Sequence, residues 1–203
     1  MRLYSWFACT GRGDRVGMIG YAFCGSFCTI GRSLQIFEKL HLAGNDLFPI
    51  CSENVYATDT RFGYAAEFCE TVERICGKKP IHTIADAEPL GPKIALDALL
   101  LCPCTGNTLA KMANGITDTA VTMAAKAHLR SDRPLVIALA SNDALSANLK
   151  NVAAMLARKS VYFVPMRQDD PVGKPHSLVA DFSMVEETLR LALQGKQIPR
   201  LFV

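Results

Sequence analysis

Apolar and polar residues follow one another along this chain in blocks that predict strands alternating with helices. Short apolar runs between glycine, proline or polar residues are typical of buried strands, and apolar residues recurring every three or four positions are typical of helices that cover a sheet. The predicted strands are 16–23, 47–51, 81–84, 95–102, 134–140 and 161–164. The predicted helices are one that spans Ile30 to Leu40 and ends before Gly44, one that begins at Asn107, and those at 62–76, 144–158 and 183–194.

Strands that alternate with helices in this way form right-handed βαβ units. The expected fold is therefore α/β, a single doubly wound, Rossmann-like or flavodoxin-like parallel sheet with helices on both faces. Polar loops are predicted at 52–60, 88–93 and 165–176. Residues 1–15 lack the long apolar core of a secretion signal and are expected to form a disordered extension, which leaves one domain at 16–203.

Composition excludes several functional classes. The 203 residues carry 22 Lys and Arg against 19 Asp and Glu, without a basic block, so nucleic-acid binding is not expected. No apolar run is long enough to cross a membrane. The eight cysteines include no C-x-x-C pair, so we expect reduced thiols and no metal site.

Two strand ends carry residues that could hold an anionic ligand. Ligands of open α/β sheets bind beyond the carboxyl ends of the strands, where helix N-termini expose unpaired N–H groups. The turn after the first strand is Gly25-Ser26-Phe27-Cys28-Thr29, and the segment after the fourth strand begins with Thr105, Gly106, Asn107 and Thr108. Each could bind a phosphate, but on the motif alone an ordinary turn with helix caps is the favoured interpretation of the first.

The segment from Pro103 to Thr119 also resembles a known family. Its match to the flavin-containing cysteine decarboxylases, in order and spacing, comprises Pro103, Asn107, Thr108, Lys111, Ala113, Asn114, Gly115, Ile116 and Asp118. The resemblance implies bound FMN. The cofactor-binding residues that it implies are Gly25, Ser26, Phe27, Thr29, Ser52, Thr105, Gly106, Asn107, Thr108, Ser141 and Asn142.

The chain departs from the decarboxylase pattern at two places. The family's catalytic His is replaced by Glu88, and Ser141 stands where family members have a Met beside Asn142. Decarboxylation is therefore not expected. Glu88 is a candidate general base if its loop buries it, and otherwise a solvated carboxylate. Arg61 and Lys93 are the cations expected to meet an acidic substrate at the carboxyl ends of the strands.

Within that superfamily the chain is similar to the dipicolinate synthase B-subunit family. The supporting stretches are TDTRFG at 58–63, AEPLGPK at 87–93, MAAKAHLR at 123–130, SNDAL at 141–145 and YFVP at 162–165. This resemblance implies oxidation of a dihydrodipicolinate-type ring to dipicolinate. In that role Arg61, Lys93 and Asn107 contact a small dicarboxylate.

The same resemblance implies the setting and the partners. The partner would be an A subunit that binds NAD(P), since no strand of this chain precedes a G-x-G-x-x-G turn. Homo-oligomers and the cytoplasm of a sporulating mother cell are also implied. Two alternatives remain open, a flavin-free subunit that only assembles with the A subunit and a flavin decarboxylase with a relocated base.

Overall fold

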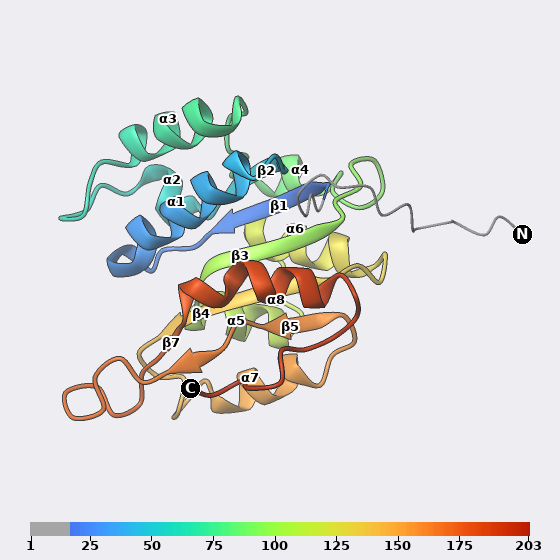
Figure 1. The fold of residues 1–203 in the computed structure, drawn as a ribbon. Helices are drawn as coiled ribbons and strands as arrows, with labels where there is room; N and C mark the ends of the chain where they lie inside the picture. The colour runs from blue at the N-terminus through green and yellow to red at the C-terminus, as the bar shows by residue number, and fades with distance from the viewer. Residues whose placement is uncertain (1–16) are drawn as a thin grey trace, which may run out of the picture.

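One mixed, seven-stranded sheet forms the centre of the computed structural model, which describes residues 17–203 (Figure 1). The predicted extension at 1–15 lies outside the described residues. The strands are β1 (Met18–Phe23), β2 (Asp46–Cys51), β3 (Ala98–Thr105), β4 (Leu135–Ser141), β5 (Val161–Phe163), β6 (Met166–Arg167) and β7 (Leu178–Ala180). Their order is β2-β1-β3-β4-β7-β6, with β5 also paired to β4. Strands β1 to β5 pair in parallel, whereas β7 pairs antiparallel with β4 and β6.

Helices cover both faces of the sheet, as the sequence predicted (Figure 1). One face carries α1 (Phe27–Leu42), α2 (Glu53–Ala57), α3 (Ala65–Cys76) and α8 (Val185–Ala192), which follows a short 3₁₀ helix at Phe182–Met184. The other face carries α4 (Ile84–Ala87), α5 (Gly106–Ala113), α6 (Ala120–Leu129) and α7 (Leu149–Leu156). No helix in this part of the chain is long and apolar enough to span a membrane.

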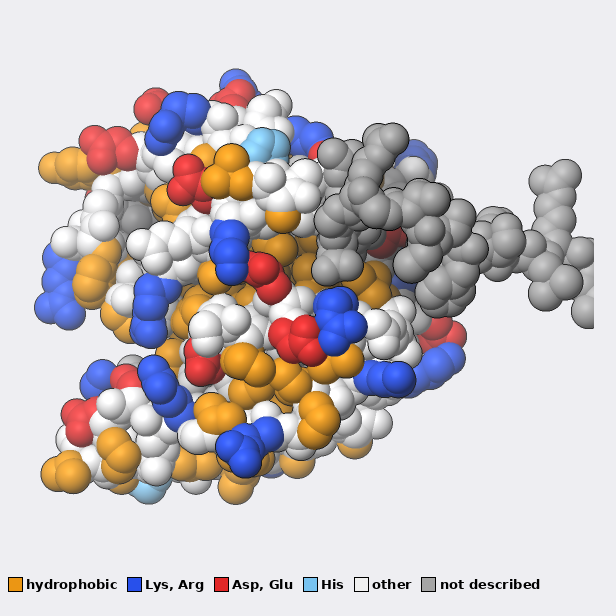
Figure 2. Space-filling model, in the orientation of Figure 1, with side chains coloured by type: hydrophobic (Ala, Val, Ile, Leu, Met, Phe, Trp, Pro, Cys, Tyr) orange, Lys and Arg blue, Asp and Glu red, His pale blue; other side chains and the backbone are white. Residues whose placement is uncertain are grey.

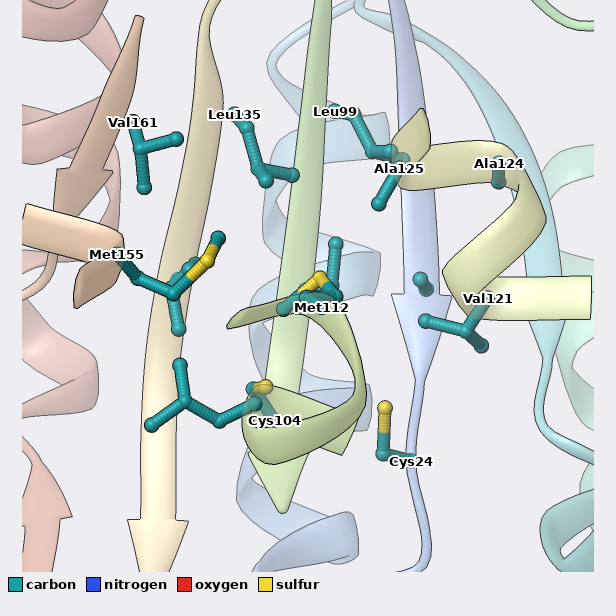
Figure 3. Packing of buried hydrophobic residues seen from close by; sticks show 14 of the residues in the cluster. Cys24, Leu99, Cys104, Met112, Val121, Ala124, Ala125, Leu135, Met155 and Val161 are labelled. Carbon is teal, nitrogen blue, oxygen red and sulfur yellow. The ribbon is translucent and has the colours of Figure 1, made fainter. Parts of the chain in front are cut away.

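Alternation along the strands separates the core into two layers. In β1, Tyr21 and Phe23 pack with the α1 layer, while Ala22 and the following Cys24 pack with the α5 layer. Successive side chains of a strand point to opposite faces, so each buried strand contributes to both layers. Figure 3 shows the α5 layer, in which Met112, Ala125 and Met155 lie over the sheet.

The strand order creates a crevice between β1 and β3. The chain leaves β1 toward β2 on one side and leaves β3 toward β4 on the other, so the turns after these neighbouring strands diverge. This point is where doubly wound sheets bind their ligands, and the order 2-1-3-4-5 is that of flavodoxin-like folds. The crevice opens at the carboxyl ends of β1 and β3, at the left in Figure 1.

Several local predictions were wrong. The predicted loop at 52–60 contains α2, because the Ser52 hydroxyl accepts a hydrogen bond from the Val55 N–H and starts a helical turn. The predicted strand at 81–84 is reduced to a single bridge between Ile81 and Ile50, and Ile84 begins α4.

The region after β4 also differs from the prediction. The helix predicted at 144–158 begins only at Leu149, after a series of turns. The loop predicted at 165–176 contains β6, and β7 follows it. Both strands are so short that neither alternation nor helical spacing could reveal them. They turn the predicted parallel sheet into a mixed one at this edge.

Candidate functional site

A cavity of about 820 Å³ lies at the carboxyl ends of β1, β3 and β4, and we call it the main cavity. Ligand sites commonly have volumes of about 300 to 1,000 Å³. The segments that line it are 25–29 with Arg32, Arg61 with Phe62, 105–107 with Ala110, 140–143 with Asn148, and Asp169, Lys174 and Val179. Figure 2 shows a notch on this side of the molecule, with Lys and Arg side chains on both of its edges.

The N-terminus of α1 opens into the main cavity without a side-chain cap. Ser26 is the N-cap residue, but its side chain makes no capping hydrogen bond to the helix. Instead its Oγ accepts a hydrogen bond from Thr29 Oγ1 at 3.0 Å. The first N–H groups of a helix have no intrahelical acceptor and carry partial positive charge. The turn therefore presents donors suited to an anion.

The N-terminus of α5 is capped and tightly packed. Thr105 Oγ1 accepts from the Thr108 N–H at 3.2 Å. A Cβ atom on Gly106 would lie 2.4 Å from Ser141 Oγ and 2.7 Å from Asn148 Nδ2. Glycine at this position lets α5 approach the β4–α7 turn closely, because any side chain would collide with these polar atoms.

Asp143 is the centre of a polar cluster in this turn. Ser141 Oγ donates to Asp143 Oδ1 at 2.5 Å, and Asn148 Nδ2 donates to both carboxylate oxygens at 2.9 Å. Asn151 Nδ2 in turn donates to Asn148 Oδ1 at 2.8 Å. The hydrogen bond from Ser141, followed by that from Asn148, lowers the pKa of Asp143 below its ordinary value. An ionised carboxylate therefore lies in the wall at neutral pH.

Three cations line the main cavity. Arg61 is exposed and its guanidinium lies 4.8 Å from the centre of the Phe62 ring. Arg32, one turn into α1, lies 5.1 Å from the centre of the Phe182 ring. Lys174 is paired with Asp169 at 3.2 Å. Burial acts to raise the pKa of Asp169, but the hydrogen bonds that its carboxylate accepts outweigh this effect and lower the pKa. The wall also contains the carboxylates of Asp143 and Asp169, so Arg32 and Arg61, together with the open N-terminus of α1, are the groups that favour an anionic ligand.

Most of the predicted site residues come together in this cavity. Those in its wall are Gly25, Ser26, Phe27, Thr29, Arg61, Thr105, Gly106, Asn107, Ser141 and Asn142. Ser52 and Thr108 are not in the wall. The Ser52 hydroxyl caps α2, and Thr108 is buried, with its hydroxyl bonded to Thr105 Oγ1 at 3.1 Å. Their hydroxyls are engaged in helix caps beside the cavity.

Glu88 and Lys93 are not among the residues that line the main cavity, and the predicted placement of Lys93 at the carboxyl ends of the strands was wrong. Both are exposed residues of the segment that leads into the amino end of β3. In that segment a Cβ atom on Gly91 would lie 2.5 Å from the Ala127 carbonyl oxygen, at the end of α6. Figure 1 shows this loop at the edge of the sheet opposite the crevice. The burial that a catalytic Glu88 would need is absent, and its side chain is solvated.

Sequence reasoning missed five polar residues of the wall. They are Arg32, Asp143, Asn148, Asp169 and Lys174. Arg32 could have been found, because it lies little more than one helical turn after the start of α1 and lines the same cavity. Asp143 adjoins Asn142, which the sequence did single out. The remaining three depend on how the β4–α7 turn and the β6–β7 loop fold back.

Cys104, within β3, is not a reactive thiol. Cys104 is fully buried, and burial raises the pKa of its thiol well above the ordinary value. It packs in the α5 layer (Figure 3), as a small hydrophobic residue does. Cys28 is exposed in the cavity wall, where its sulfur lies 3.9 Å from Ser26 Oγ.

The lowered pKa of Asp143 predicts a pH-dependent contribution to stability. A carboxyl whose folded pKa lies below its unfolded value of about 3.9 stabilises the fold above that pH, and the contribution is lost as the pH falls through the folded value. Asp143→Asn should therefore be less stable than wild type at pH 7, and the difference should shrink at an acid pH, as the carboxyl becomes protonated in the folded state. Urea unfolding of both proteins at the two pH values measures this. An unchanged difference between the two pH values would contradict it.

Comparisons with known proteins agree with the fold and the family resemblance. Residues 18–185 match the family model described as Flavoprotein. The chain is 40% identical over 185 residues to the B subunit of dipicolinate synthase from Bacillus subtilis (strain 168), an alignment that covers 91% of this chain and 92% of the relative. These findings confirm the resemblance inferred from the sequence.

Solved structures support the same conclusion. The dipicolinate synthase B subunit from Bacillus halodurans C superposes with a TM-score of 0.85 and 36% identity, covering 96% of this chain and 98% of that one. The FMN-dependent cysteine decarboxylase SpaF superposes with a TM-score of 0.64 and 22% identity, covering 86% and 96%. The first confirms the predicted fold class, and the second, at its lower identity, shows a shared fold.

Proposed function

Because this chain belongs to the flavoprotein family, to which residues 18–185 match, we propose that it is the B-type subunit of a dipicolinate synthase. In this role it oxidises a dihydrodipicolinate-type ring to the aromatic dicarboxylate. The observation that supports the proposal is the main cavity, where the uncapped N-terminus of α1 opens at the β1–β3 crevice and Arg32 and Arg61 line the wall. The two relatives named as B subunits of dipicolinate synthase support the choice of substrate.

The residues of the main cavity fit FMN. The open N–H groups at the start of α1, with Ser26 and Thr29, would hold the phosphate. Thr105, Gly106, Asn107, Ser141 and Asn142 would border the ring. When bound, the flavin supplies a hydride acceptor. The family match and the FMN-dependent structural neighbour support this cofactor.

For the substrate, we assign one carboxylate to Arg61 and the orientation of the ring to Asn107. Arg61 can donate two parallel hydrogen bonds to a carboxylate, and both residues are exposed in the cavity wall. Lys93 has no part in this arrangement, because its segment lies at the opposite edge of the sheet.

A flavin-free assembly subunit is the second candidate. The observation in its favour is Ser141, whose hydroxyl is bonded to Asp143 where family members cover the flavin with a Met. A decarboxylase is disfavoured because no His lies in the wall of the main cavity among the described residues. Flavin binding separates the first two candidates.

We expect the purified protein to bind FMN, and Ser26→Asp to weaken that binding at least ten-fold, or about 1.4 kcal/mol. An Asp at the N-cap stabilises a helix, so the fold should keep its melting temperature, while the new carboxylate repels the phosphate. Quenching of FMN fluorescence gives both affinities. Riboflavin, which lacks the phosphate, is the matched ligand and should bind both proteins alike.

A colourless protein that does not quench FMN fluorescence at micromolar concentrations would leave the assembly subunit as the better candidate. Equal affinity of wild type and Ser26→Asp for FMN would instead place the phosphate elsewhere.

We further expect association with a separate A subunit, which would bind the NAD(P), and self-association of this chain in the cytoplasm of the mother cell. The relatives are named as B subunits, which implies an A subunit. Size-exclusion chromatography after co-expression should show both chains in one peak. Elution as two independent monomers would contradict this expectation.

A further inference from the structure

A second cavity, of about 330 Å³, lies between the ends of α5, α6 and α7, and we call it the helix groove. It shares no lining residue with the main cavity. Its walls come from helices on a single face of the sheet, the α5 layer. Its volume is within the range of small-molecule sites, so its chemistry indicates what it can bind.

The charges of the helix groove all have one sign. Lys126, Arg130 and Arg158 line it, and no Asp or Glu does. None of the three forms an ion pair within the described part of the chain. The carboxylate of Asp118, close by in sequence, is held by Lys111 at 2.9 Å. The groove therefore has positive charge that the described residues leave uncompensated.

Arg158 is held in position across the groove. Its Nη1 donates to the Met112 carbonyl oxygen at 3.1 Å and lies 3.9 Å from Met155 Sδ. The other N–H groups of a guanidinium remain available to a ligand. Lys126 lies in the last turn of α6, and Arg130, four residues later, is the C-cap of the same helix, so the two residues lie on the same side of that helix end. The C-terminal ends of α6 and α7 thus supply donors to the same small volume.

The rest of the groove is largely apolar. Met112 and Leu129 line it, and Ile116 extends its wall with 47% of its surface exposed. Thr122 also lines it, but its hydroxyl is engaged in a capping box with Thr119. An inorganic anion would leave the apolar wall in water, and a neutral apolar molecule would leave the cations without partners. An anion with a ring-sized apolar body satisfies both.

We propose that the helix groove is a second binding site, which takes a small aromatic carboxylate. The carboxylate pairs with Arg158 and Lys126, and the ring packs against Ile116 and Leu129. The helix dipole also stabilises cations near helix C-termini. That effect alone would explain cations on the surface, but it would not require a cavity between them. The site stands on its own residues, independently of the function proposed for the main cavity.

Calorimetric titration with pyridine-2,6-dicarboxylate tests this site at low and at physiological salt. Lys126→Gln and Arg158→Gln should each weaken binding by about ten-fold or more, as loss of a charge-assisted hydrogen bond predicts. Lys159→Gln is the matched control, because Lys159 is an exposed cation paired with Asp132 outside the groove. It should bind as wild type does. Sulfate and pyridine, each carrying half of the required chemistry, should bind more weakly.

Repeating the titration in the Arg61→Ala background separates the two cavities. Lys126→Gln and Arg158→Gln should each weaken binding of the dicarboxylate in the Arg61→Ala background as well, whatever Arg61 contributes in the main cavity. Arg158 also supports the Met112 carbonyl, so Lys126→Gln is the variant that leaves the described hydrogen bonds intact. If Lys126→Gln and Arg158→Gln both bound the dicarboxylate with wild-type affinity, the proposal would be overturned. Sulfate binding as tightly as the dicarboxylate would overturn the assigned ligand class.

Discussion

Replacing Gly106 by Ala is expected to lower the free energy of unfolding by about 2 to 4 kcal/mol and to weaken ligand binding in the main cavity. The added Cβ would lie 2.4 Å from Ser141 Oγ, 2.7 Å from Asn148 Nδ2 and 2.9 Å from Asp143 Oδ1. Ser141 Oγ and Asn148 Nδ2 both donate hydrogen bonds to Asp143 Oδ1, so moving any of the three atoms breaks a hydrogen bond to a carboxylate. Urea unfolding and FMN titration measure the two effects.

Gly31→Ala is the matched control for this experiment. Gly31 lies inside α1, and a Cβ at this position would have no atom within 4 Å. Alanine in a helix interior is favoured over glycine by up to about 1 kcal/mol, so this variant should be as stable as wild type or more stable. If Gly106→Ala behaved like Gly31→Ala, α5 would not depend on close contact with the β4–α7 turn.

Arg61→Ala should reduce kcat/KM for formation of dipicolinate by about ten-fold to a hundred-fold, measured with the A subunit present. The change removes a charge-assisted hydrogen bond to a substrate carboxylate, which is worth about 1.5 to 3 kcal/mol. The melting temperature should hardly change, because Arg61 is exposed and its one described contact is with the Phe62 ring. The kcat/KM of Arg61→Lys should lie between those of wild type and Arg61→Ala, since lysine keeps the charge and loses the paired donors.

Lys93→Ala and Glu88→Gln are the controls, and both should keep wild-type turnover. These residues lie at the edge of the sheet opposite the main cavity. If Arg61→Ala kept the kcat/KM of wild type, the assignment of Arg61 to the substrate carboxylate would be wrong. A loss of turnover in Glu88→Gln would show that the edge at the amino end of β3 takes part in the reaction.

The sequence predicted the part of the site that depends on consecutive residues. The turn from Gly25 to Thr29 and the segment from Thr105 to Asn107 each join a buried strand to a helix, so their position at the carboxyl edge follows from local pattern. Because the site lies at the carboxyl ends of the strands, the sequence could also have excluded Lys93 from it. This residue precedes its strand, and residues that precede a strand of a parallel sheet lie at the opposite edge from those that follow it.

Other features depended on contacts between distant segments. Asp143 acquires its lowered pKa only because Ser141 and Asn148 converge on it after the turn folds. The strands β6 and β7 have two and three residues, and they form because β7 pairs with β4 and β6 pairs in turn with β7. Lys174 reaches the main cavity through the loop that these strands close.

The sequence by itself thus determined the alternation of strands and helices, the family, and the two turns that face the crevice. These follow from hydrophobic burial and backbone conformation, which act over a few neighbouring residues. The tertiary structure decided which charges share a cavity and which are kept apart at opposite edges. That outcome depends on strand order and on packing between segments that lie far apart in the chain, and the spacing of residues along the sequence does not encode it.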